Sequence, residues 1–331
     1  MTWFERITGF AEKYPDQVRV HLSVDDQTWT SNVNCKSYVF GRLETPSLAE
    51  LRERVQSVPA PGIRTTVCEV VANVQELHRD PANQGSLFQV ASQFNLLEMV
   101  SPRIVPEAGV GIYEQDHTQG PACAIAAGAG TIYRNYLVPL NGRIGQSRDN
   151  QIDCLADMGT SLGNHQNSLW TMQNGYVLPS EQGLATVSQR LDEMGNEEID
   201  ELRKLLRIGL QWRTQVTLED AAHGVTQAYC SALPVAYAGF SPEKWEAFAR
   251  LVLEAAYEAT LCAGILNARE SGNRKLYLTL LGGGAFGNRM DWIMDSILRA
   301  LSLFQDAGLE VLVVSYGRSC PCVNEIIEQI G

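Results

Sequence analysis

Four glycines within six residues are the feature of this chain best suited to chemistry. Gly282, Gly283 and Gly284 follow an apolar run, and Gly287 comes three residues later. Glycine lets backbone N–H groups come close to a ligand, and the apolar periodicity of 290–305 predicts a helix whose start favours an anion. The segment is therefore expected to bind a phosphate group.

The residues around these glycines indicate which class of phosphate-binding loop this segment can be. An ATPase loop needs Lys and then Ser or Thr after the last glycine, whereas Asn288 and Arg289 follow Gly287 here. The span Gly282–Gly287 fits the GxGxxG pattern of dinucleotide-binding proteins, but no acidic residue stands suitably after the next strand. A glycine turn that only packs a helix against a sheet is a further alternative.

Two acids, Glu114 and Asp116, stand on a second loop, ahead of Gln119-Gly120-Pro121. Proline near the first turn predicts a helix over 122–129, so this loop also leads into the positive end of a helix. Two such loops on one sheet suit a diphosphate, and the carboxylates are candidates for general acid–base chemistry. The alternative is that both acids only stabilise the helix start as surface charges.

Short apolar runs alternate with helical patterns along the chain, which predicts an α/β fold with a largely parallel sheet. Ser47 and Ser241 are expected to cap two of the helices. Asn95 follows an apolar strand, at the sheet edge where ligands usually bind. The expected strands are 18–24, 37–40, 65–74, 87–92, 225–235, 277–281 and 309–314, and the expected helices are 48–55, 122–129, 197–208, 241–267 and 290–305.

The composition is that of a folded, acidic protein. The 331 residues carry a net charge of −12, with 45% hydrophobic and 19% charged residues. The charge argues against non-specific nucleic-acid binding, which needs a basic surface. We see no secretory signal and no apolar run of membrane-spanning length, and we expect a cytoplasmic protein with no membrane or nucleic-acid partner.

The eight cysteines are scattered and include no CxxC pair, which is typical of reduced core residues in an intracellular protein. Cys320 and Cys322 are a candidate metal or redox pair, with incidental proximity as the alternative. No His-rich cluster accompanies the cysteines, and no metal is expected.

Several segments, taken in order, resemble the macrodomain family. Asn73 stands at the strand end where the family usually places the Asp that reads adenine, and Asn95 matches the ribose-side Asn. The stretch 109–126 takes the place of the first, catalytic loop but departs strongly from its glycine-rich motif. Gly282–Asn288 is similar to the second, diphosphate-binding loop, and Tyr316 sits where an aromatic often stacks on adenine.

This resemblance covers 62–136 and 225–317 and implies a three-layer fold, with a mixed, mostly parallel sheet between helices. It leaves 1–61 as an N-terminal extension packed on the core. The domain is then 62–331, with a mainly helical insertion at 141–224.

The resemblance also implies ADP-ribose as ligand or product and no separate cofactor. A carboxylate near the distal ribose would handle water or the leaving group, with Asp116 as first candidate and Glu114 as second. The ligand contacts that it implies are Asn73, Asn95, Gln119, Gly120, Gly282, Gly283, Gly284, Ala285, Phe286, Gly287, Asn288 and Tyr316.

Short segments are similar to a divergent group of macrodomains that includes arginine-specific ADP-ribosyl hydrolases: TQGPACA, YRNY, QIDCLAD, QNGY and YCSALPVAY. The expected substrate is thus an ADP-ribosylated protein, with arginine as the candidate linkage. Two alternatives stay open. One is a reader module that binds ADP-ribose without cleaving it, and the other is a nucleotide-dependent oxidoreductase that uses the GxGxxG segment.

Polar residues of the expected insertion are candidates for specificity. Asp149, Asp153 and Asp157 lie four apart, so on a helix they would form one acidic face for a cation or a guanidinium. Asn174 and Tyr176 are candidates for a wall beside the site.

Overall fold

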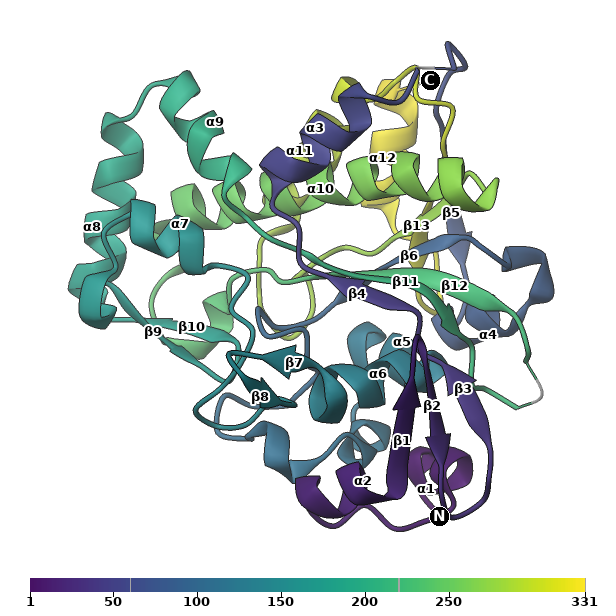
Figure 1. Ribbon diagram of the computed structural model, residues 1–331. Helices are drawn as coiled ribbons and strands as arrows, with labels where there is room; N and C mark the ends of the chain where they lie inside the picture. Colours follow the sequence, from purple (N-terminus) through teal and green to yellow (C-terminus); the bar gives the residue numbers. More distant parts are fainter. Residues whose placement is uncertain (60, 220, 331) are drawn as a thin grey trace.

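A computed structural model describes residues 1–59, 61–219 and 221–330, and a seven-stranded sheet runs through its centre (Figure 1). In spatial order the strands are β4 (Arg42–Glu44), β11 (Gly209–Gln215), β12 (Gly224–Cys230), β6 (Leu87–Ala91), β13 (Lys275–Leu278), β14 (Glu310–Ser315) and β5 (Thr66–Val71).

Five neighbouring strands of this sheet, from β12 to β5, run parallel to one another. β4 and β11 add two antiparallel pairings at the other side. Because parallel strands end at the same edge, the segments that follow β6, β13, β14 and β5 meet there. The expected α/β class with a mixed, mostly parallel sheet is confirmed.

Helices cover both faces of the sheet (Figure 1). One face carries α3 (Leu48–Gln56), α10 (Glu246–Ser271), α11 (Met290–Leu303) and α12 (Pro321–Ile330), and the other carries α4 (Val74–Arg79), α5 (Gln119–Ala126) and α6 (Gly128–Ile132). By length and composition, Pro242–Ser271 could cross a membrane, but 89% of its apolar window is buried inside the fold. That burial is typical of a core helix.

The N-terminal residues form a small module below the sheet, made of α1 (Trp3–Thr8), α2 (Pro15–His21), β1 (Leu22–Asp25), β2 (Thr28–Ser31) and β3 (Ser37–Val39). A capping box between Thr2 and Glu5 begins α1. The module packs on loops of the main fold through a second hydrophobic core: Trp3, Phe4, Ile7, Val18, Leu22, Trp29, Phe40, Leu97, Met99, Val110, Tyr113, Ala124, Ile125, Ala129, Ile132, Tyr136 and Leu137.

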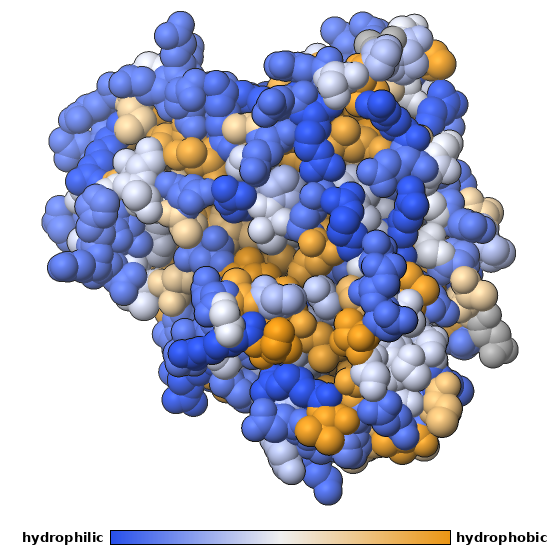
Figure 2. Space-filling view, in the orientation of Figure 1, coloured by the Kyte–Doolittle hydropathy of each residue, from blue (hydrophilic) through white to orange (hydrophobic). Residues whose placement is uncertain are grey.

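The expected insertion contains α7 (Ala156–Ser161), α8 (Glu181–Glu193) and α9 (Asn196–Lys204), the hairpin of β9 (Trp170–Gln173) and β10 (Tyr176–Pro179), and β8 (Arg143–Ile144), which pairs with β7 (Pro139–Leu140). It also supplies β11 to the main sheet, and the expected N-terminal extension supplies β4. Both segments are therefore continuous with the central sheet, and the domain boundaries stay a prediction. Figure 2 shows a mostly hydrophilic surface over α8 and α9.

Some elements differ from the sequence expectations because polar residues and prolines interrupt apolar runs. The expected strand 18–24 is divided between α2 and β1, since Pro15 begins a helix there. β5 ends at Val71 because the Asn73 side chain accepts the Gln75 N–H at 2.8 Å and caps α4.

Two further boundaries were wrong near the site. The strand expected over 225–235 ends at Cys230, and a loop follows it. The long helix expected from Ser241 begins as a 3₁₀ turn over Pro242–Trp245, where Ser241 makes no side-chain cap, and α10 proper starts at Glu246.

All six tryptophans are buried: Trp170, Trp212, Trp245 and Trp292 in the main core, and Trp3 and Trp29 in the second core.

The cysteines differ from the expectation of reduced core residues, because Cys35 and Cys68 are exposed. Cys320 and Cys322 are joined by a disulfide.

Candidate active site

Two adjoining cavities lie at the edge where the parallel strands end. The first, of about 260 Å³, lies between the loop after β6 and the glycine loop after β13. The second, of about 570 Å³, lies beside the ends of β5 and β14. Both are lined by Asp116, Thr118, Gln119 and Thr279, so they form one candidate site of ligand size.

The glycine loop forms one wall of the first cavity and is held by its own hydrogen bonds. The Gly287 N–H donates to the Gly284 carbonyl and the Asn288 N–H to the Gly282 carbonyl, both at 3.0 Å. Gly282 and Gly287 have φ of 77° and 71°, a region that favours glycine. The fold thus explains these two glycines through backbone conformation.

Three consecutive amides of this loop are available to an anion. Among the described residues, the N–H groups of Gly284, Ala285 and Phe286 have no backbone or side-chain acceptor. The Gly283 N–H, which was expected to bind phosphate, donates instead to the Leu280 carbonyl at 3.1 Å. Successive free amides form a concave anion site.

Asn288 was expected to contact the ligand, but its side chain holds the loop. It is buried, and its Nδ2 donates to the Leu233 carbonyl at 2.8 Å. α11 begins only at Met290, beyond the last glycine. In a dinucleotide fingerprint the helix opens within the glycine pattern, so this geometry does not favour the oxidoreductase alternative.

The start of α5 forms the opposite wall. The Gln119 side chain accepts the Ala91 N–H at 2.9 Å and donates to the Gln89 carbonyl at 2.8 Å, which fixes the helix to the end of β6. A Cβ on Gly120 would lie 2.0 Å from the Ala91 carbonyl oxygen and 2.3 Å from Oε2 of Glu98. Gln119 and Gly120 therefore hold the helix start at the site. The side-chain amide of Gln119 is already hydrogen-bonded to the backbone of β6.

A third acid, Glu98, lies in the first cavity and was missed by the sequence analysis. Its side chain is 3% exposed, and its Oε1 has no hydrogen-bond partner among the described residues. Burial raises the pKa of Glu98 well above its ordinary value; the nearby Asp116 carboxylate raises it further, and Arg134 opposes the shift. Burial therefore disfavours the charged form of this carboxyl group.

Tight local structure aims Glu98 into the cavity. Leu97 and Met99 on either side are buried in the second core, so the residue between them faces the other way. Gln93 accepts the Met99 N–H at 2.9 Å, and Leu96 has a φ of 64°. A left-handed leucine costs about 1–3 kcal/mol and is tolerated where the surroundings determine the backbone.

A sequence signal for Glu98 did exist. It is a lone acid within the otherwise apolar run Leu96–Val100. Acids are rarely buried unless they are paired or functional.

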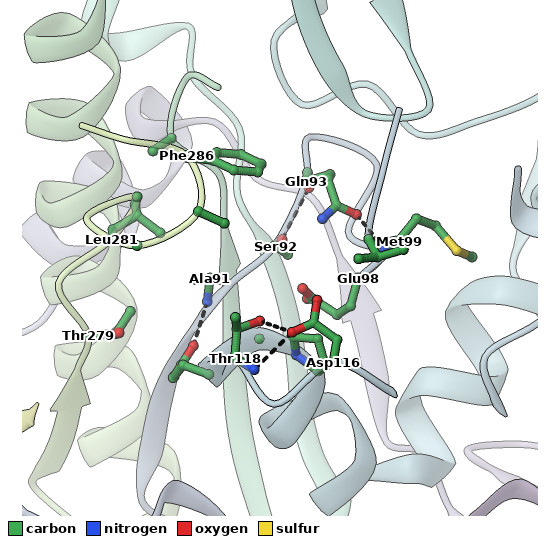
Figure 3. A pocket seen from close by; sticks show the side chains of 18 of the residues that line it. Ala91, Ser92, Gln93, Glu98, Met99, Asp116, Thr118, Thr279, Leu281 and Phe286 are labelled. Carbon is green, nitrogen blue, oxygen red and sulfur yellow. Dashed lines mark hydrogen bonds between the residues drawn. The ribbon is translucent and has the colours of Figure 1, made fainter. Parts of the chain in front are cut away.

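Asp116 lies between the two cavities, next to Glu98. Its Oδ1 accepts the Thr118 N–H at 2.9 Å and the Thr118 hydroxyl at 2.7 Å, which closes the turn into α5. In Figure 3 the carboxyl groups of Glu98 and Asp116 lie side by side, with Leu281 and Phe286 across the cavity.

Glu114, the second catalytic candidate, is tied to the N-terminal module. Its Oε1 accepts the Trp3 N–H at 2.6 Å and pairs with Arg6 at 2.9 Å. It lines only the second cavity, away from Glu98. The structure therefore favours a structural role for Glu114.

Asn95, expected at the ribose, does not line either cavity. It is fully buried, and its Nδ2 donates to Gln151 at 2.9 Å while its Oδ1 accepts the Leu97 N–H at 3.1 Å. The strand ends before it, and the turn at 93–96 directs its side chain into the protein.

The second cavity contains the two residues expected near adenine. Asn73 and Tyr316 both line it, and the Tyr316 ring is 80% exposed and free to stack. The first cavity ends in an aromatic cluster of Tyr176, Tyr237 and Phe286, whose ring centroids are 5.3 to 5.7 Å apart.

Most of the predicted site residues thus line two connected cavities. Four of them line neither cavity: Asn95, Gly283, Gly287 and Asn288. No family model matches this chain. No curated protein matches it either.

Solved structures do match. Poly(ADP-ribose) glycohydrolase from Deinococcus radiodurans, in complex with ADP-ribose, is 12% identical with a TM-score of 0.48, over 88% of this chain and 95% of that one. The enzyme from Thermomonospora curvata is 12% identical with a TM-score of 0.48, over 96% of each chain.

Proposed function

We propose that this chain binds ADP-ribose and hydrolyses the bond between its distal ribose and a protein side chain. The observation that carries the proposal is Glu98, a buried acid next to Asp116 whose Oε1 has no hydrogen-bond partner in the part of the chain that the structure describes. These acids lie between the glycine loop, which has three backbone amides without an acceptor among the described residues, and the start of α5. Glycoside hydrolysis generally uses a pair of carboxyl groups, and a neighbouring anion site would hold the diphosphate of ADP-ribose.

The two cavities suggest how ADP-ribose would lie. The diphosphate would bind the free amides of Gly284, Ala285 and Phe286, facing the positive start of α5. The adenosine would extend into the second cavity, toward Asn73 and Tyr316. The distal ribose would then occupy the first cavity, where the acids are.

In the proposed reaction water attacks C1 of the distal ribose, and the bond to the side chain breaks with its electron pair on the leaving atom. Protonated Glu98 gives its proton to that atom, and the Asp116 carboxylate takes a proton from the water. The raised pKa of Glu98 favours its role as the proton donor. Proton exchange with solvent restores both groups.

We further propose arginine as the linkage, in keeping with the short motifs described above. A guanidine that leaves with a proton becomes a cation. The aromatic cluster of Tyr176, Tyr237 and Phe286 lines the cavity that holds the acids. Aromatic faces attract a guanidinium through cation–π interactions, and carboxylates add charge complementarity.

A reader that binds ADP-ribose without cleaving it is the second candidate. The favouring observation is that one Asp116 oxygen already accepts two hydrogen bonds from Thr118, as a purely structural cap would.

The test is to incubate the protein with arginine-, glutamate- and serine-linked ADP-ribosyl peptides and to identify the products by mass spectrometry. We expect free ADP-ribose and intact peptide from the arginine linkage. Asp116→Asn should slow this release by about 10²–10⁴-fold, because the amide cannot take a proton, while ADP-ribose affinity is kept. Binding without cleavage of any peptide would leave the reader function.

A further inference from the structure

A third cavity, of about 520 Å³, adjoins the site on the side of the expected insertion. Its lining is mainly polar and comes from the segment after Glu98 and from two segments of the insertion. The lining residues are Arg103, Val105, Arg148, Asp149, Gln151, Ile152, Asp153, Met172, Gln173 and Asn174.

A hydrogen-bonded wall separates this third cavity from the first. Asn174 Nδ2 donates to the Pro102 carbonyl at 2.7 Å, and Gln151 Nε2 donates to Asn174 Oδ1 at 2.8 Å. The Tyr176 hydroxyl donates to the Met99 carbonyl at 2.6 Å. Tyr176 and Met99 line the first cavity, whereas Gln151 and Asn174 line the third, so the wall is about one layer of residues thick.

Two arginines that line the third cavity, Arg103 and Arg148, have no carboxylate partner among the described residues. Within the described ranges, neither Arg103 nor Arg148 forms an ion pair, and Glu107 receives only the backbone N–H of Arg148. Unpaired arginines converging on one cavity are notable in a chain of net charge −12.

The acids at this cavity are already compensated. Asp149 pairs with Arg143 at 3.0 Å. Asp153 accepts the Leu155 N–H at 2.9 Å, and burial raises its pKa. The acidic helix face expected from Asp149, Asp153 and Asp157 does not exist, because α7 starts only at Ala156. The lining thus holds two aspartates and two arginines, and of these four only the two arginine side chains have no ionic or hydrogen-bond partner among the described residues. These two side chains are therefore free to bind an anionic group.

We propose that the third cavity binds an acidic side chain, Asp or Glu, of the modified protein, close in sequence to the residue that carries ADP-ribose. The inference rests on the proposed function. A modified side chain in the first cavity would bring its sequence neighbours over the wall toward Arg103 and Arg148. Arginine pairs well with carboxylates, and rim charges of this kind select partners.

The test compares labelled peptides that carry arginine-linked ADP-ribose between Asp, Ser or Lys neighbours. Binding is measured by fluorescence anisotropy with the Glu98→Gln variant, which should hydrolyse the peptides about 10²–10⁴-fold more slowly than the wild type. We expect the Asp peptide to bind about tenfold more tightly than the Lys peptide, a difference near 1.4 kcal/mol. The difference should shrink as salt is added, because exposed charges are screened.

Charge reversal should invert this ranking. In the Glu98→Gln background, the double variant Arg103→Glu with Arg148→Glu should bind the Lys peptide most tightly. If that variant does not fold, the double variant Arg103→Gln with Arg148→Gln takes its place, and it should bind the three peptides with equal affinity. Arg269→Glu is the matched control, because Arg269 is exposed at the end of α10 and has no ion pair among the described residues. Free ADP-ribose should bind all variants equally.

The two proposals fail in different ways. Equal affinities for the three peptides, with ADP-ribose binding intact, would overturn the acidic-neighbour site. Absence of free ADP-ribose binding by the wild-type protein would overturn the proposed function, and this inference with it. Ranked binding without cleavage by the wild type would overturn hydrolysis alone.

Discussion

At the scale of single residues, Glu98 has an environment that disfavours its charge. Its carboxyl group is buried against Gly120, and one oxygen lacks a partner among the described residues. An unsatisfied buried polar atom lowers stability by about 1–3 kcal/mol. A buried acid of this kind in a cavity is a candidate for a group that reacts with a bound ligand.

We expect Glu98→Gln to lower single-turnover hydrolysis by about 10²–10⁴-fold, because the amide keeps the size of the side chain but cannot donate the proton. The ADP-ribose Kd should change little, since the diphosphate contacts are elsewhere. Rapid-quench measurements with isothermal titration separate the two effects. Full turnover by the variant would reject the assignment of Glu98.

The same substitution should change how stability depends on pH. The folded state raises the pKa of Glu98 above its unfolded value of about 4.3, so the folded protein binds the proton more tightly. The stabilisation is complete below the unfolded pKa and is lost as pH rises through the folded one. The melting temperature of Glu98→Gln should therefore rise relative to that of the wild type as the pH increases above about 4. A difference between the two melting temperatures that does not change with pH would contradict a raised pKa.

Gly284→Val tests the proposed anion site at the free backbone amides of the glycine loop. A Cβ on Gly284 meets no atom within 4 Å, and its φ is not positive, so the fold should accept valine. The added methyl groups should obstruct the amides and weaken ADP-ribose binding by more than about tenfold. Gly282→Val is the contrast, because its φ is 77° and its Cβ would lie 2.4 Å from Ala232, so this variant should melt earlier.

At the scale of elements, the N-terminal module holds the loop that leads to Asp116. The Glu12 carboxylate accepts N–H groups of Val110 and Gly111 at 2.9 and 2.7 Å, and the Tyr136 hydroxyl at 2.6 Å. Glu114 ties the same loop to Trp3. Residues 98 to 124 positions apart thus fix the approach to the site.

Glu12→Gln should loosen this loop, because an amide has one acceptor oxygen and would turn N–H groups toward other donors. We expect faster hydrogen exchange at 107–118 and slower hydrolysis, with unchanged exchange in the glycine loop. Exchange measured by mass spectrometry checks this, with Glu53→Gln, an exposed position on α3, as control. Unchanged exchange at 107–118 would remove the role of Glu12.

Local patterns predicted much of this arrangement. Alternation of apolar runs and helices gave the sheet class, and the glycines marked a loop that does line the cavity, because both signals depend on near neighbours. The role of Glu98, the tie between Glu114 and Trp3, and the buried position of Asn95 all depend on contacts between distant segments. Periodicity carries no information on such contacts.

At the scale of the whole molecule, the site joins segments from most of the chain. The cavities are lined by residues from Arg6 to Tyr316, across the N-terminal module, both loops and the insertion. A ligand that touches all of them should stabilise the fold as one unit rather than locally.

We therefore expect ADP-ribose to raise the melting temperature. Binding to the folded state alone adds about 2.7 kcal/mol at a ligand concentration a hundred times the Kd. AMP, which lacks the distal ribose and the second phosphate, should shift melting less at the same concentration. A shift with AMP that equals the shift with ADP-ribose would argue against the proposed placement of the distal ribose.

The burial of all six tryptophans makes the chain its own optical reporter. None of the indoles lines the first or second cavity. Intrinsic emission should consequently redden when the protein unfolds and stay nearly constant when the site fills. Tryptophan fluorescence therefore measures the integrity of every variant above without interference from its ligand.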